Sequence, residues 1–292
     1  TAMYAHSSPM RNVLPLLSML LMSSCGPEKP PGAADAKWQT ELQKALTDAQ
    51  TSPGLRGASI GLCVLDGKGD VLFDAQAHTA FIPASALKTV TTATALELLG
   101  PDFHFVTELR AASPIQNGLL EGDLVLVGGG DPMLDLAALE QIATQLHASG
   151  LRRITGGIRV DTSLFQGSLY PDFWNWGDIG NGYGSGVCAL NLNHNRYTAR
   201  FRPGKTADLP ATFLGVEPDV PGVTFRHEVT TGPAGSGDGV MIHGGEKTSV
   251  IHLRGTVPLG SKEFAVIGAV TDPASFAAHH FQRLLADRGI QI

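Results

Sequence analysis

The spacing of apolar residues in the first part of the chain predicts a helix followed by a β-hairpin. In segment 38–49 the apolar residues recur at the helical period, so they share one side of a helix. Segments 58–65 and 71–73 read as strands. The polar and glycine residues 66–70 between them are typical of a hairpin loop. We therefore expect a short helix beside a two-stranded antiparallel unit.

A second helix is predicted at the end of the hairpin, within segment 81–100. Its later positions include the small residues Thr91, Ala93 and Ala95, as a helix that is buried on most sides requires. The pattern stops at Gly100, which precedes a proline, and this pair is a C-terminal helix signal.

Farther along, the pattern changes to short strands around a few helices. Between residues 197 and 259 nearly every apolar stretch is short and bounded by proline or glycine turns. A last helix is predicted over 273–288, with Phe276, His280 and Leu284 on one side. The other expected elements are the strands 105–109, 124–127, 157–160 and 264–270 and the helix 136–148.

The composition is that of an ordinary soluble protein. The chain has 292 residues, which suggests about two domains. Hydrophobic residues make up 43% and charged residues 16%, as in a soluble globular protein. The formal net charge is −6, and the few Lys and Arg residues are scattered without a basic stripe. The sequence therefore argues against a nucleic-acid partner.

The first 25 residues have the pattern of an export leader. The apolar run 13–22 is too short to span a bilayer but suits the core of a signal peptide. Ser23 and Ser24 precede Cys25, and this order resembles a bacterial lipoprotein cleavage site, in which Cys25 becomes the lipidated first residue. The alternative is a plain secretory peptide cut nearby. In both cases we expect an exported protein, and in the first the membrane is a partner through the anchor on Cys25.

Ser85 and Lys88 are the candidate catalytic pair. They stand three residues apart at the start of the second predicted helix, so their side chains point to the same face. A serine hydroxyl becomes a good nucleophile when an adjacent base takes its proton, and a lysine amine can be that base when it is uncharged. The alternative is structural: Ser85 caps the helix and Lys88 lies on its solvated face.

The segment PASALKTVTTATALELLGPDFHF from Pro83 resembles the nucleophile region of the penicillin-recognising serine enzymes. It is most similar to the class C penicillin-binding proteins, which are D-alanyl-D-alanine carboxypeptidases that also act as endopeptidases. The resemblance continues in order over nearly everything after Gly54. Its further segments are LVLVGGGDPML from Leu124, ITGGIRVDTSLF from Ile154, ALNLNHN from Ala189, LRGTVPLG from Leu253 and AVTDPASFAAHHFQRLLADRGI from Ala269.

The resemblance implies an α+β fold, namely a penicillin-binding or β-lactamase-like catalytic domain with an inserted, mostly β accessory region. The expected domain map is the leader 1–25, a tether 26–36, the first part of the catalytic domain 37–104, the accessory region 105–262 and a return to the catalytic domain over 263–292. The resembled enzymes also carry Ser-x-Asn and Lys-Thr-Gly elements. Neither string occurs here, so we expect a truncated sequence, with a natural inactive short form as the alternative.

Asp178 and Tyr183 are candidate substrate-binding residues by the same resemblance. They match an acid and an aromatic residue that in the family reach over the cleft to the substrate's side chain. A carboxylate there would pair with the free amino group of a diaminopimelate-type peptide stem. The structural alternative is a surface Asx turn and a packing tyrosine.

The function that the resemblance implies is that of a serine-type D-alanyl-D-alanine carboxypeptidase and endopeptidase acting on peptidoglycan stem peptides in the periplasm or cell envelope. Lys88 would act as the base, Ser85 would form the acyl-enzyme, and β-lactams would inhibit. Two alternatives remain: a β-lactamase or esterase on the same scaffold, and a non-enzymatic envelope lipoprotein that binds peptidoglycan.

No metal or cofactor is expected. The ten histidines form no His-Glu-x-x-His string, and the adjacent His279 and His280 should not share one face of a helix. The glycines at 128–130 lack the ending of a phosphate-binding loop.

Cys63 falls in a strand pattern and is expected to be buried. The sequence alone does not decide whether Cys63 and Cys188 form a disulfide.

Overall fold

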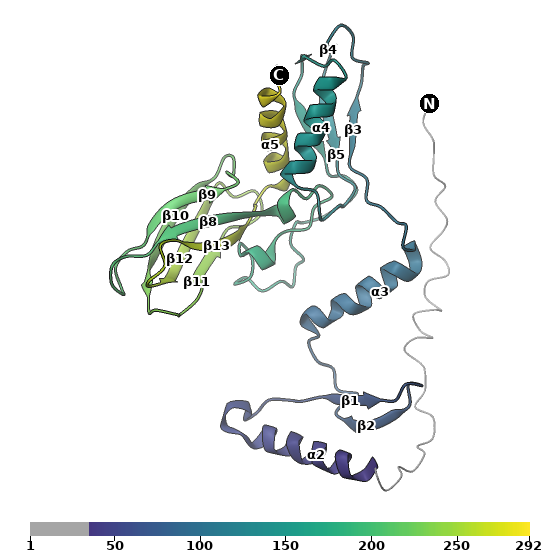
Figure 1. Cartoon of the computed structure of the whole chain (residues 1–292), viewed down its shortest axis with the longest axis vertical. Helices are drawn as coiled ribbons and strands as arrows, with labels where there is room; N and C mark the ends of the chain where they lie inside the picture. The colour runs from purple at the N-terminus through teal and green to yellow at the C-terminus, as the bar shows by residue number, and fades with distance from the viewer. Residues whose placement is uncertain (1–34) are drawn as a thin grey trace. The chain divides into compact units, whose positions relative to one another are not determined.

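The computed structural model describes residues 35–292, which form two compact units that divide between Pro101 and Asp102 (Figure 1). The leader, Cys25 and most of the predicted tether lie outside the described residues. The division falls close to the predicted start of the accessory region at residue 105. Within residues 35–292, no helix has the length and apolar composition needed to cross a bilayer.

The N-terminal unit contains the predicted helix, hairpin and second helix. Strands β1 and β2 pair antiparallel, and Asp66 holds their connecting loop by accepting hydrogen bonds from the backbone N–H groups of Lys68 and Asp70. Helix α2 lies against the hairpin, with the Trp38 and Phe73 ring centroids 6.3 Å apart. The elements are α2 (Asp35–Thr51), η1 (Pro53–Leu55), β1 (Leu62–Leu65), β2 (Val71–Ala75), η2 (Ala84–Ala86) and α3 (Leu87–Leu99).

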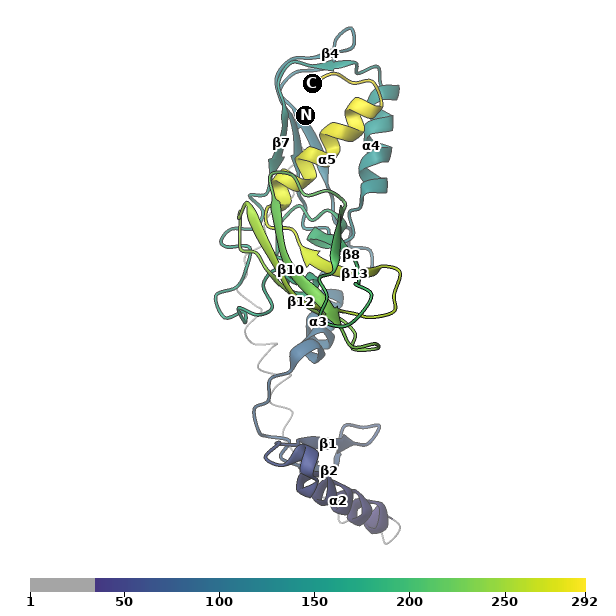
Figure 2. The same cartoon turned by 90° about the vertical axis from the view of Figure 1, so that its left-hand side faces the viewer.

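The C-terminal unit combines a helix-covered sheet with two further sheets of three strands each (Figures 1 and 2). Its elements are β3 (Glu108–Ala111), β4 (Leu119–Leu120), β5 (Leu124–Val127), α4 (Leu136–Ala148), β6 (Arg153–Ile154), β7 (Ile158–Asp161), η3 (Gly182–Gly184), η4 (Asn193–Asn195), β8 (Arg196–Arg202), β9 (Thr212–Glu217), β10 (Thr224–Gly232), β11 (Gly239–His243), β12 (Val250–Pro258), β13 (Phe264–Ala269) and α5 (Pro273–Asp287).

The helix-covered sheet has the strand order β3-β5-β7. Strands β5 and β7 are parallel, and α4 makes the crossover that a parallel pair needs. Helix α5 packs beside α4 (Figure 2). The core between these elements includes Leu126 of β5, Leu139 of α4 and Phe281 and Leu285 of α5, all at 0% exposure.

The other two sheets, β13-β8-β9 and β10-β12-β11, enclose a second part of the core. Aromatic rings connect them: Phe201 of β8 lies 5.4 Å from Phe213 of β9, and Phe213 lies 5.8 Å from Phe225 of β10, between ring centroids. A backbone bridge between Pro210 and Thr230 joins the β9 side of one sheet to β10 of the other. The strand-rich pattern of this part of the sequence thus corresponds to two packed sheets.

Segment 263–292 packs in the same unit as the strands before it. Strand β13 pairs antiparallel with β8, and α5 packs beside α4 and β7. The apolar side predicted for this helix is confirmed, because Phe276 and His280 are buried. The return of the segment to the catalytic domain stays a prediction.

The aromatic rings between the two sheets allow a test of the packing of the core. Phe201→Ala should lower the free energy of unfolding by about 3–5 kcal/mol, because Phe201 is fully buried and its removal leaves a cavity. Chemical denaturation followed by far-UV circular dichroism measures this change. Phe173→Ala is the matched control: the Phe173 side chain is 100% exposed, so the change should stay within about 0.5 kcal/mol. Equal effects of the two substitutions would contradict the packing described.

Candidate active site

Ser85 and Lys88 lie together where the 3-10 turn η2 passes into helix α3. Ser85 is the middle residue of η2, and Lys88 is the second residue of α3. The Lys88 Nζ donates a hydrogen bond to the Ser85 Oγ over 2.8 Å. The structure therefore brings the predicted nucleophile and base into contact through local backbone geometry alone.

The structural alternative for Ser85 is wrong. The N-cap positions of η2 and α3 are Pro83 and Ala86, and neither makes a side-chain cap. The Ser85 hydroxyl accepts from Lys88 at a position inside the turn. The side chain is thus free of a capping role and directed to the amine.

Ala84, directly before Ser85, has a left-handed backbone conformation with φ of 43°. This conformation costs a non-glycine residue about 1–2 kcal/mol, because its Cβ crowds the following carbonyl. Such strain is often found at functional sites, where it holds a side chain in place. The sequence gives no signal for this left-handed conformation, since alanine does not favour positive φ values as glycine does.

The prediction that α3 is mostly buried is wrong for the described residues. Every residue from 81 to 99 is exposed, including Ser85 and Lys88. Large apolar side chains nevertheless point out from the helix: Leu87, Val90, Leu96, Leu98 and Leu99 are each between 53% and 61% exposed. A helix that is apolar on all sides belongs in the interior of a protein. The sequence of α3 therefore requires other protein surface to pack against it, and the described residues do not supply that surface.

Asp178 and Tyr183 come together in the loop that surrounds η3. The Asp178 carboxylate lies close enough to the Tyr183 phenol to affect it electrostatically. Partial burial, followed by the charge of Asp178, raises the pKa of the Tyr183 phenol. The Tyr183 side chain is 69% exposed, so it is not the packing tyrosine of the structural alternative. The Asx turn of this loop belongs to Asn175, whose Oδ1 accepts from the backbone N–H of Gly177.

This loop is fixed between the edge strands β11 and β13. The backbone of Asn181 forms a bridge to Gly268 of β13, and its buried side chain donates to the Gly177 carbonyl over 2.8 Å. Gly182 and Gly184 allow the loop backbone to lie directly against Ile267 of β13 and against the Asp178 carbonyl group. A Cβ at Gly182 would lie 2.3 Å from the Ile267 Cγ2, and one at Gly184 would lie 2.1 Å from the Asp178 carbonyl oxygen. The alternating glycines of this loop are the sequence signal for the close contact.

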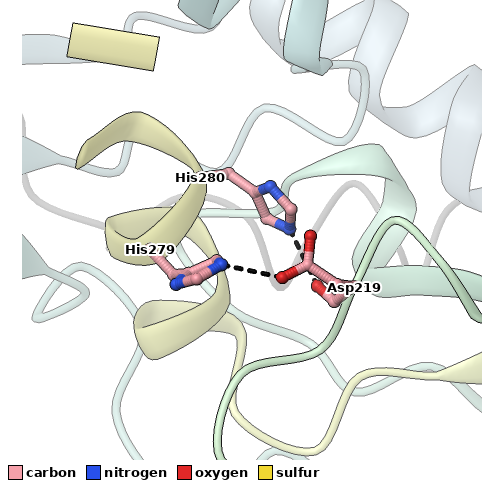
Figure 3. A group of neighbouring side chains, drawn as sticks. All are labelled: Asp219, His279 and His280. Atoms are coloured by element: carbon pink, nitrogen blue, oxygen red, sulfur yellow. Dashed lines mark hydrogen bonds and ion pairs between the residues drawn. The ribbon is translucent and has the colours of Figure 1, made fainter. Parts of the chain in front are cut away.

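A second cluster of polar side chains corrects the argument against a metal site. His279 and His280 of α5 both turn toward Asp219, which lies in the connection between β9 and β10 (Figure 3). One ligand atom of each of the three residues lies within 4.8 Å of the others. Adjacent positions on a helix diverge near the backbone, but the long imidazole rings converge on a residue placed between them. We call these three residues the Asp219 cluster.

Charge and burial act in opposite directions on the Asp219 cluster. Burial disfavours the Asp219 carboxylate, but the hydrogen bond from His279 and the nearby cationic Arg283 together hold its pKa below the usual value. Burial is the main cause that lowers the pKa of His280, while the hydrogen bond to the Asp219 backbone and the charge of Asp219 act in the opposite direction.

The two cysteines of the described residues are free. Cys63 is exposed, against the expectation of burial, because it lies on the uncovered face of the β1–β2 hairpin. Cys188 is buried, and burial raises the pKa of its thiol. A thiol of this kind is held in its unreactive protonated form.

Comparison with known proteins finds one family over most of the chain. The sequence pattern described as the D-Ala-D-Ala carboxypeptidase 3 (S13) family matches residues 42–292. The D-alanyl-D-alanine carboxypeptidase of Actinomadura sp. (strain R39) is 30% identical over 96% of this chain and 52% of its own length. The chain thus spans about half the length of this relative.

Solved structures give the same picture. The crystal structure of penicillin binding protein 4 (dacB) from Haemophilus influenzae matches with a TM-score of 0.66 and 26% identity, over 77% of this chain and 49% of that one. The structure of the same protein complexed with a novel β-lactam matches with a TM-score of 0.59 and 24% identity, over 77% and 48%. The predicted fold class is confirmed by these matches.

The close approach of the η3 loop generates a prediction. Gly184→Ala should lower the free energy of unfolding by about 1–3 kcal/mol, because the new methyl group collides with the Asp178 backbone. Urea denaturation monitored by tryptophan fluorescence measures the change. Gly245→Ala is the matched control, since a Cβ there meets nothing within 4 Å, and it should be neutral or slightly stabilising. A neutral Gly184→Ala would show that the loop is not tightly held.

Proposed function

Because the chain belongs to the D-Ala-D-Ala carboxypeptidase 3 (S13) family, we propose that it is part of a serine-type D-alanyl-D-alanine carboxypeptidase and endopeptidase. Its substrates would be the stem peptides of peptidoglycan. The observation that carries the proposal is the 2.8 Å hydrogen bond between the Lys88 Nζ and the Ser85 Oγ. A nucleophile and a base in this contact are what an acyl transfer needs at its first step.

In the proposed cycle, Lys88 first removes the proton of the Ser85 hydroxyl. This transfer requires the uncharged amine, whose lone pair accepts the Oγ–H in place of the N–H···Oγ bond of the structure. The Ser85 oxygen then attacks the carbonyl carbon of the penultimate D-alanine, and the terminal D-alanine leaves with a proton from Lys88. Water hydrolyses the resulting ester and frees Ser85 for another turnover.

The turn that holds Ser85 also offers a donor for the oxyanion. The N–H groups of the first residues of a helix have no partner within the helix, and Ser85 occupies such a position in η2. Its backbone N–H would stabilise the negative oxygen of the tetrahedral intermediate. The family's Ser-x-Asn and Lys-Thr-Gly elements would complete the site, and neither string occurs in these 292 residues.

Asp178 and Tyr183 are proposed to recognise the side chain of the stem peptide. The Asp178 carboxylate would pair with a free amino group of a diaminopimelate-type residue, and the nearby Tyr183 phenol would help to orient that carboxylate. Support comes from the tight placement of the loop between β11 and β13, since recognition requires a fixed carboxylate.

Inhibition by β-lactams and an extracytoplasmic location complete the proposal. A β-lactam would acylate Ser85 and remain attached. Support comes from the Haemophilus influenzae protein described above, which was solved in complex with a β-lactam. Peptidoglycan lies outside the cytoplasmic membrane, so the proposed activity requires export. Segment 13–22 supports export, and Cys25 is the proposed site of a lipid anchor.

Labelling with a fluorescent penicillin tests Ser85 and Lys88. In a protein that includes the Ser-x-Asn and Lys-Thr-Gly elements, Ser85→Ala should abolish the covalent label on a denaturing gel. Lys88→Met should slow acylation by roughly 10²–10⁴-fold, because the hydroxyl loses its base. Lys44→Met, which removes an exposed lysine of α2, should label at the normal rate. A normal rate in Lys88→Met would remove lysine from the role of base.

Substrate choice tests Asp178. Asp178→Asn should lower kcat/KM by roughly 10–100-fold for a stem peptide with a free side-chain amine, because the ion pair is lost. For a peptide with an acetylated side chain the value should hardly change. The control is Asp172→Asn, an exposed carboxylate on the same loop, which should leave both values unchanged. An equal loss with both peptides would assign Asp178 a structural role.

A further inference from the structure

We propose that the Asp219 cluster binds a divalent transition metal of the Zn²⁺ class. His279 Nε2 lies 2.8 Å from Asp219 Oδ2, and His280 Nε2, at the next position of α5, lies 2.9 Å from the backbone oxygen of the same residue (Figure 3). The three ligand atoms lie within 4.8 Å of one another, so a modest opening of the cluster would place each at about 2.0–2.2 Å from one ion.

The donor set selects the kind of metal. Two imidazole nitrogens and one carboxylate oxygen suit Zn²⁺ and its neighbours, whereas Mg²⁺ and Ca²⁺ prefer sets made of oxygen atoms alone. Three protein ligands leave a fourth position of a tetrahedral site for water. On binding, the Nε2 protons of both His279 and His280, which face oxygen atoms of Asp219, move to Nδ1 or are released, because each coordinating nitrogen must offer its lone pair.

Neighbouring residues orient the proposed metal ligands, as the residues around the ligands do in known metal sites. Arg283 donates to the other carboxylate oxygen, Asp219 Oδ1, over 2.6 Å, so Oδ2 remains directed at the histidines. The Phe276 ring contacts the His280 ring edge to face, with centroids 4.5 Å apart, and fixes its orientation. The two imidazole rings are themselves nearly perpendicular at 84°, as two rings that approach one ion from different directions can be.

The cost of binding is small. His280 Nε2 contacts the Asp219 backbone carbonyl over 2.9 Å, and coordination would replace this hydrogen bond by a metal bond. The carboxylate of Asp219 is 53% exposed and the His279 side chain 34%, so an ion can reach the cluster from solvent. The site is therefore largely preformed and accessible.

A bound ion would cross-link two parts of the C-terminal unit. Asp219 lies in the connection between β9 and β10, and both histidines lie on α5, about 60 residues later. A metal bond between them would fasten the strand-rich part to the helix-covered sheet. Its role would be structural and independent of the Ser85–Lys88 pair, which contains no metal ligand of this kind.

The experiment is a titration of the chelator-treated full chain with ZnCl₂, by isothermal calorimetry and thermal unfolding. One equivalent should bind with Kd in the order of micromolar, and the unfolding midpoint should rise by roughly 5 °C when free Zn²⁺ is about 100 times Kd. MgCl₂ at the same concentration should leave the midpoint unchanged. His279→Gln should weaken Zn²⁺ binding by at least about 10-fold.

The matched control is His78→Gln. His78 Nε2 lies 3.8 Å from Asp74 Oδ2 on the surface, so it forms a histidine–carboxylate pair without a second histidine, and its loss should leave Zn²⁺ affinity unchanged. His279 is partly exposed, so its substitution is expected to preserve the fold, which far-UV circular dichroism verifies. The absence of saturable binding, an equal effect of Mg²⁺ or an unchanged affinity in His279→Gln would each overturn the proposal.

Discussion

The C-terminal unit depends on one constraint: two sheets of three strands can enclose a core only if the gaps between their edges are closed. On one side the Pro210–Thr230 bridge closes the gap. On the other, the loop around η3 occupies the space between β11 and β13. Open sheet edges carry unpaired backbone groups, and this arrangement pairs some of them within the unit. The same closure fixes Asp178 and Tyr183, so substrate recognition is proposed to be a by-product of how the core is sealed.

The Ser85–Lys88 pair follows a different logic, because short-range geometry produces it. Three residues of spacing and one strained alanine suffice to bring the amine to the hydroxyl, although every residue around them is exposed. Positioning and activation are therefore separate properties here. Contact is local, while the dry surroundings that an uncharged amine needs must come from residues far away in sequence.

The sequence predicted elements with strong periodicity well. The helix expected over 136–148 is α4 with the same bounds, because its apolar side is regular and Asp135 caps it by accepting from the Ala138 N–H. The strand expected over 58–65 is shorter and begins at Leu62. Strand ends are set by pairing with β2, which no local pattern encodes.

Long-range features escaped prediction for the same reason. The exposure of α3 depends on what covers it, and apolar composition reports only what a helix requires. The convergence of His279 and His280 depends on Asp219, some 60 residues away, so the adjacent pair alone gave a misleading geometric argument. Asp178 and Tyr183 were found through resemblance, and their proximity became visible only in three dimensions.

The late position of α5 has a consequence for biosynthesis. Phe276, Phe281 and Leu285 complete the core that β5, β7 and α4 begin more than a hundred residues earlier. As the polypeptide leaves the ribosome, that apolar surface must wait uncovered until this helix emerges. The nascent protein would therefore be vulnerable to aggregation during this interval, and holdase chaperones are the natural protection for it.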